Sequence, residues 1–198
     1  MAARRGDVTI RPEPVRAEAR VPQPTVWLTY SFAPEWFHDA LREAQTGHDH
    51  DSRRREIVFA VCFAESYLFE WVRDEVLKGD YDGLLEYFPV PHKRRGVRRR
   101  WKEVLKQLLE NGKIRKAPDL GGRHEQEWKR LVDYRDGLVH ARASRPQTTA
   151  RPNERMPVPS KTDLDRLAAG WAVRVVIERV RLLHEAVNTP VPEWLVDP

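Results

Sequence analysis

An arginine and a histidine stand five positions apart, as Arg135 and His140, late in a segment with helical periodicity. A guanidinium binds a phosphate through paired, charge-assisted hydrogen bonds, and an imidazole exchanges a proton near neutral pH. These two groups would suffice to anchor a phosphodiester and to act as a general acid or base during its cleavage. Asp136 lies four residues before His140, on the same helix face, where its carboxylate would orient the imidazole.

A single helix does not aim both groups at one atom. At about 100° per residue, Arg135 and His140 lie roughly 140° apart around the helix axis. Two copies of the helix crossing in a homodimer would bring both pairs into one groove. Gly137 costs about 1 kcal/mol relative to alanine inside a helix, and a partner helix approaching closely would explain it. The alternative is that Arg135 and His140 are ordinary surface residues and Gly137 is a tolerated local defect.

The run Tyr134–Ala141 matches an R-x-x-x-x-H pattern and resembles the active-site motif of the HEPN family (higher eukaryotes and prokaryotes nucleotide-binding). An earlier apolar segment with Glu65 and Ser66 embedded in it resembles an early helix of the same family. The resemblance covers about residues 51–188. It implies an all-α homodimer whose cleft contains two copies of Arg135 and His140, with Glu65 and Ser66 as supporting residues.

The same resemblance implies a metal-independent endoribonuclease of toxin, defence or RNA-processing type, needing no cofactor. The 2′-hydroxyl of RNA is then the nucleophile, His140 exchanges protons, and Arg135 stabilises charge on the phosphate. A cognate antitoxin or inhibitor protein would be a further partner. In one branch of the family a tyrosine that a partner enzyme modifies stands two residues after the histidine. Arg142 occupies that position here, so this form of regulation is not expected.

Basic residues are densest between positions 92 and 102. A positively charged helix start is unfavourable to the helix dipole, which favours a role in contacting phosphate. Trp101, within this run, is expected in the core rather than as a base-stacking surface. The candidate RNA-binding residues are Lys93, Arg94, Arg95, Arg98, Arg99, Arg100 and Lys102.

Two readings compete with catalysis. A non-catalytic helical module would bind RNA or a protein through the basic run, and a structural subunit would do neither. Glu65, in apolar surroundings, is expected to be paired, or protonated if buried. A salt bridge with Arg135 would be either structural or a means of tuning the cleft, and the structural role is favoured.

A metal site is a weaker prediction. The segment 47–51 combines histidines with carboxylates, but a solvated linker with a helix cap accounts for it better, because no distant ligand is evident. The single cysteine, Cys62, excludes a disulfide within the chain and is expected to be a small buried apolar residue.

Hydrophobic spacing and turn residues predict an all-α fold, with four main helices and a short N-terminal one forming a bundle. The short helix is expected after Pro34 and the main helices at about 51–78, 97–111, 124–143 and 161–187, with Asp51 or Ser52 as N-cap of the first. A loop is expected over 79–96 and a loop insert over 144–159. Residues 1–25 are expected to form an extended arm, with a short strand at 26–30. Residues 26–198 would then form one domain.

Composition narrows the class of partner. The 198 residues carry a net charge of +5, which suits a polyanion such as RNA. No apolar stretch approaches the roughly 18 residues of a membrane span, and the N-terminus lacks the pattern of a signal peptide. The sequence therefore predicts a cytoplasmic protein with no membrane association.

Overall fold

The computed structural model describes residues 32–47, 49–79, 83–88, 96–115, 122–140 and 159–195. Helices dominate these ranges and no strand occurs within them. The predicted all-α class is confirmed for this part of the chain. The arm at 1–25, the strand at 26–30 and most of the insert at 144–159 lie outside the described residues.

The first two helices form a hairpin. Helix α1 (Ala33–Thr46) begins with Pro34 in its first turn, as predicted, and α2 spans His50–Trp71. Gly47 lies in the turn between them, where an added Cβ would come 2.1 Å from Cβ of Ser52, so a larger residue would force the turn to shift. The N-cap of α2 is Asp49, whose side chain accepts a hydrogen bond from the Ser52 backbone N–H at 2.7 Å. The prediction of Asp51 or Ser52 as the cap was wrong by two or three residues.

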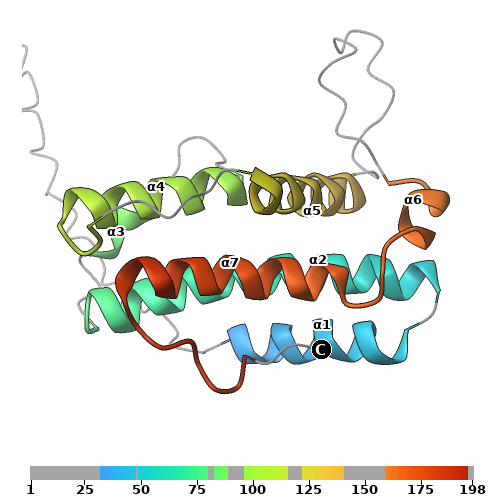
Figure 1. Ribbon diagram of the computed structural model, residues 1–198, viewed down its shortest axis with the longest axis horizontal. Helices are drawn as coiled ribbons and strands as arrows, with labels where there is room; N and C mark the ends of the chain where they lie inside the picture. Colours follow the sequence, from blue (N-terminus) through green and yellow to red (C-terminus); the bar gives the residue numbers. More distant parts are fainter. Residues whose placement is uncertain are drawn as a thin grey trace, which may run out of the picture. The chain divides into compact units, whose positions relative to one another are not determined.

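Helix α2 lies at the centre of the described helices and contacts α1, α5, α6 and α7. Figure 1 shows α2 and α7 side by side, with α1 on one side and α5 on the other. Such a position requires apolar residues around most of the helix, as its sequence indicated. The buried side chains of α2 include Ile57, Val61, Phe63, Tyr67, Leu68 and Trp71.

The last turn before the Gly79 stop is π-helical rather than α-helical. This segment, η1 (Val72–Val76), follows α2 directly, and the Leu77 backbone N–H reaches back five residues to the Val72 carbonyl at 3.0 Å. The chain then leaves the helix through Lys78 and Gly79, both with positive φ. The expected helix end before Gly79 is therefore correct, but its final turn is wider than predicted.

The described residues between 83 and 140 contain three helices: α3 (Leu84–Tyr87), α4 (Val97–Glu110) and α5 (Gly122–His140). The loop predicted over 79–96 is wrong at α3, where Leu84 and Tyr87, three positions apart, both become buried. Helix α4 agrees with its predicted range to one residue. Helix α5 begins two residues earlier than predicted, and residues 141–143 lie outside the described residues.

The predicted helix at 161–187 is two helices. Helix α6 (Lys161–Asp165) begins at the expected capping box of Ser160 and Asp163, and α7 spans Trp171–Val187. Gly170 breaks the run with φ of 70°, a conformation that glycine adopts without steric cost. The N-terminus of α7 is capped from elsewhere in the chain, because the buried carboxylate of Glu56 accepts the Ala172 backbone N–H at 2.9 Å. Burial raises the pKa of Glu56.

Two tryptophans and an arginine form the core between α4, α5 and α7. Trp101 is buried, as predicted, and its ring meets Trp128 edge-on with centroids 5.9 Å apart. The Arg179 guanidinium carbon lies 5.2 Å from the Trp101 ring centroid and 5.3 Å from that of Trp128. Arg179 is 3% exposed and pairs with Glu125 at 3.1 Å. A cation is thus held in the core by two aromatic faces and one carboxylate.

Among the described helices, none has both the length and the apolar character needed to cross a membrane.

Candidate functional site

Arg135 lies on the part of α5 that faces α2 and is held there by two carboxylates. Its Nη2 donates to Oε2 of Glu65 at 3.2 Å, and its Nη1 lies 2.9 Å from Oδ1 of Asp136. The Arg135 side chain is only 15% exposed. The expectation that a guanidinium on the packing side of this helix needs a partner is confirmed, and so is the Glu65–Arg135 salt bridge.

Glu65 joins three helices through one carboxylate. Besides Arg135 on α5, it accepts a hydrogen bond from Nη1 of Arg100 on α4 at 3.2 Å. Ser66, beside it on α2, is partly buried. One acidic residue of α2 therefore fixes both the motif arginine and an arginine from the basic run.

Asp136 forms an ion pair with the neighbouring Arg135. The sequence placed Asp136 and His140 on one helix face, and the structure adds the ion pair with the neighbouring arginine. His140 is the last residue of α5, and its side chain lies outside the described part of the chain. The two motif residues are thus on one continuous helix.

Gly137 is buried within the single chain, whereas Val139, two residues later, is 49% exposed. Val139 leaves an apolar side chain on the surface close to the motif.

The described residues of the basic run all have acidic partners. Lys93, Arg94 and Arg95 lie outside the described residues. On α4, the ion pairs are Arg98 with Asp133 at 3.7 Å, Arg99 with Glu103 at 2.8 Å, Arg100 with Glu65 at 3.2 Å and Lys102 with Glu125 at 3.3 Å. The Arg99–Glu103 pair lies within α4, and the other three contacts tie α4 to α2 and α5; all four compensate part of the positive charge.

A surface depression of about 400 Å³ joins the basic run to the motif helix. Arg98, Arg99 and Lys102 line it from α4, and Asp133 and Asp136 line it from α5. The structure thus brings together residues that sequence analysis treated as two separate features. Asp133 was not predicted, although its position on the same helix, three residues before Asp136, could have indicated it.

Cys62 lies near the same carboxylate. Burial, with a smaller contribution from Glu65, raises the pKa of its thiol. The residue is only partly buried, so the prediction of a buried Cys62 was wrong.

No group of three potential metal-ligating side chains occurs among the residues that the structure describes. In the segment 47–51, His48 lies outside the described residues, Asp49 caps α2, and His50 contacts Asp165 of α6 at 2.9 Å. Asp49 therefore caps α2, and His50 contributes to the packing of α6.

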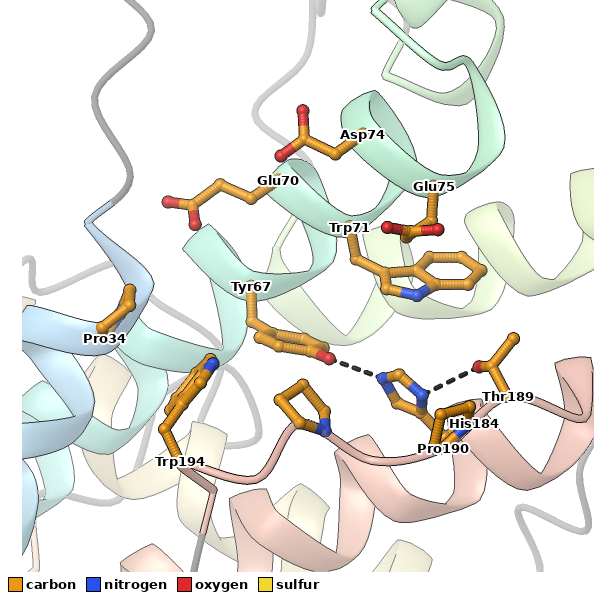
Figure 2. Close-up of a pocket in the computed structure, with 11 residues that line it drawn as sticks. Pro34, Tyr67, Glu70, Trp71, Asp74, Glu75, His184, Thr189, Pro190 and Trp194 are labelled. Carbon is orange, nitrogen blue, oxygen red and sulfur yellow. Dashed lines mark hydrogen bonds between the residues drawn. The ribbon is translucent and has the colours of Figure 1, made fainter.

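The sequence did not predict a second group of interacting side chains, which surrounds His184. Tyr67 on α2 and Thr189 after α7 both hydrogen-bond to the buried imidazole of His184, at 2.5 Å from Nε2 and 2.8 Å from Nδ1 (Figure 2). Burial lowers the pKa of His184 and raises that of Tyr67. Tyr67 and His184 are 117 positions apart, so no local spacing could have linked them.

Comparisons with protein-family models, curated proteins and solved structures give no match to this chain. The HEPN resemblance rests on the residues described in the sequence.

Proposed function

We propose that the chain is a HEPN-like, metal-independent endoribonuclease that acts as a homodimer, of toxin or defence type. The observation that carries this proposal is the position of Arg135. It is fixed by Glu65 and Asp136, and Asp136 also lines the depression beside Arg98, Arg99 and Lys102. An RNA strand following that depression would pass the motif helix.

The proposed cleavage needs only groups of the protein and of the RNA itself. The RNA 2′-oxygen attacks the adjacent phosphorus and loses its proton to a base, while the bond from phosphorus to the 5′-oxygen breaks and that oxygen gains a proton. The products are a 2′,3′-cyclic phosphate and a 5′-hydroxyl. In the proposed groove the two His140 imidazoles exchange these protons, and Arg135 stabilises charge on the phosphate oxygens.

Arg135 keeps hydrogen-bonding capacity for this role. A guanidinium has five N–H donors, and the contacts with Glu65 and Asp136 involve Nη2 and Nη1, each of which has a second N–H, while Nε is buried without a hydrogen-bond partner. A phosphate at the exposed edge of Arg135 would share the guanidinium with the two carboxylates, which hold its orientation before RNA binds.

The test is RNA cleavage by the purified chain in EDTA. The parent should leave cyclic-phosphate ends, and His140→Ala should slow cleavage by about 100-fold or more, as loss of an acid–base group does. His38→Ala changes an exposed histidine on α1 and should leave the rate unchanged. Cleavage by His140→Ala at the parent's rate would reject the catalytic assignment.

A second candidate is a non-catalytic module that binds RNA through α4. The observation favouring it is that two carboxylates already engage Arg135, as in a structural ion pair. It predicts binding that weakens steeply with salt, without cleavage. Replacing Arg98 and Arg99 with glutamine should reduce that salt dependence, whereas Arg54→Gln, at an exposed arginine of α2 paired with Asp51, should not.

A further inference from the structure

A second depression, of about 440 Å³, opens where α2 and η1 meet the segment that follows α7 (Figure 2). Its walls include the aromatic side chains of Tyr67, Trp71 and Trp194, and its rim includes the carboxylates of Glu70, Asp74 and Glu75. It shares no lining residue with the depression beside Asp136. It is therefore a candidate site separate from the proposed RNA groove.

The side chains that line this depression are more acidic than those of two other depressions on the described residues. One of these is lined by Arg98, Arg99 and Lys102 with Asp133 and Asp136, and the other by Arg123, Arg174 and Arg179 with Glu127 and Glu178. This one has three carboxylates and no lysine or arginine among its lining residues. In a chain with net charge +5, such a lining selects for a cation.

Partners outside the lining hold the carboxylates in position. Glu70 accepts the Phe32 and Ala33 backbone N–H groups at 2.7 and 3.1 Å, which places it at the start of α1. Asp74 accepts two hydrogen bonds from Arg73, and Glu75 accepts one from Lys78 at 2.9 Å. The π-helical turn η1 carries Asp74 and Glu75, and such turns occur often at functional sites.

The aromatic walls offer a surface for the body of an organic cation. Trp194 meets the Tyr67 ring at a centroid distance of 6.1 Å and an interplanar angle of 62°, and it stays 36% exposed. Part of the indole therefore remains accessible to a ligand. Aromatic faces attract alkylammonium groups through their quadrupoles, and the attraction grows when the cation is desolvated.

An unpartnered donor also lines the pocket. Trp71 is 7% exposed, and its Nε1 is buried without a hydrogen-bond partner. Figure 2 shows this nitrogen on the edge of the ring that faces His184 and Thr189. A buried N–H without an acceptor is unfavourable, and an oxygen of a bound ligand would supply that acceptor.

We propose that this pocket binds a small alkylammonium group that carries a hydroxyl or carbonyl oxygen on the same carbon chain. Its nitrogen lies at the carboxylates of Glu70, Asp74 and Glu75, and its carbon atoms lie against Trp194 and Tyr67. The Trp71 N–H donates to the ligand oxygen. A free amino alcohol and the side chain of a lysine residue in a peptide both offer this chemistry.

The test is calorimetric titration of the full chain at low ionic strength with three probes. Choline represents a free amino alcohol, N-acetyl-lysine methylamide represents a peptide lysine, and the neutral carbon analogue of choline measures shape without charge. Binding of either cation, with at least tenfold weaker binding of the neutral analogue, would support the site, and the tighter cation identifies the source.

Matched variants locate the binding. Glu75 and Glu110 are both exposed glutamates paired with a lysine, Lys78 and Lys106 respectively, but only Glu75 lines the pocket. Glu75→Gln should weaken cation binding about threefold, Trp194→Leu about fivefold, and Glu110→Gln not measurably. Absence of binding by both cations at millimolar concentration would overturn the proposal. So would equal binding of the neutral analogue, or equal effects of Glu75→Gln and Glu110→Gln.

Discussion

The Arg135 guanidinium and the Glu65 carboxylate meet 3.2 Å apart across the contact between α5 and α2. The same carboxylate binds Arg100 on α4, so one acidic side chain orients the residue on which the proposed chemistry depends. The contact with Glu65 thus both positions Arg135 and compensates its charge. Its contribution to the free energy of unfolding can be measured.

Replacing Glu65 with glutamine should lower the free energy of unfolding by about 1 kcal/mol, because two arginines lose a charged partner that is partly shielded from water. Urea unfolding of Glu65→Gln, Arg135→Gln and the double variant would give the coupling energy. Glu110→Gln, at an exposed pair on α4, should change stability by less than about 0.5 kcal/mol. Additive single effects would mean that the Glu65–Arg135 contact contributes nothing to stability.

The proposed dimer groove makes a second prediction, which concerns mixed subunits. A heterodimer of one Arg135→Ala copy and one His140→Ala copy retains one Arg135 and one His140, from opposite chains. Co-expression with two affinity tags would isolate it, and it should cleave RNA faster than either variant homodimer. A heterodimer as inactive as both homodimers would rule out a groove shared between subunits.

The buried His184 imidazole predicts a pH dependence of stability. Burial lowers its pKa below the ordinary value of 6.5, so below about pH 6.5 the unfolded chain binds a proton that the folded chain does not. The contribution of the neutral His184 imidazole to stability is therefore fully present above pH 6.5 and is lost as pH falls through the folded-state pKa. One such group changes the unfolding free energy by at most about 1.4 kcal/mol per pH unit.

His184→Gln removes this titration while keeping hydrogen-bonding atoms near Tyr67 and Thr189. Thermal unfolding at several values between about pH 7 and pH 5 should show a shallower loss of stability in the variant than in the parent. His124→Gln, at an exposed histidine beside Glu178, should retain the parent's slope. Equal slopes for parent and His184→Gln would contradict the assignment.

We expect a large loss of stability when Arg179, the cation in the core, is replaced by a small neutral residue. Arg179→Ala removes the group packed between Trp101 and Trp128 and breaks the pair with Glu125. A loss of about 3 kcal/mol in urea unfolding is expected. Arg179→Met retains most of the volume and should lose less. A change below about 0.5 kcal/mol for Arg179→Ala would show that the tryptophans pack equally well without the cation.

Local signals in the sequence predicted local structure. Pro34 marks the start of α1, Ser160 and Asp163 form the expected capping box, and Trp101 is buried. Each of these depends on residues a few positions apart. The Glu65–Arg135 pair was also predicted, because a guanidinium and a carboxylate in apolar surroundings both require a partner.

Contacts between distant residues account for what the sequence did not reveal. The break at Gly170 depends on a left-handed backbone conformation that its neighbours Ala169 and Trp171 do not indicate, and α3 becomes a helix by burying Leu84 and Tyr87. The ion pairs of Arg98 and Lys102 with α5 turn part of a basic run into packing contacts. The pocket around Tyr67 and His184 combines segments that only the tertiary fold brings together.

The hydrogen bond from the Ala172 backbone to Glu56 links the stability of α7 to that of α2. The residue before α7 is Gly170, which has no side chain to satisfy the first N–H groups of that helix. The acceptor comes from a residue 116 positions earlier in the chain. The start of the last helix is therefore capped only when α2 is packed beside it, so a change that loosens α2 also weakens α7.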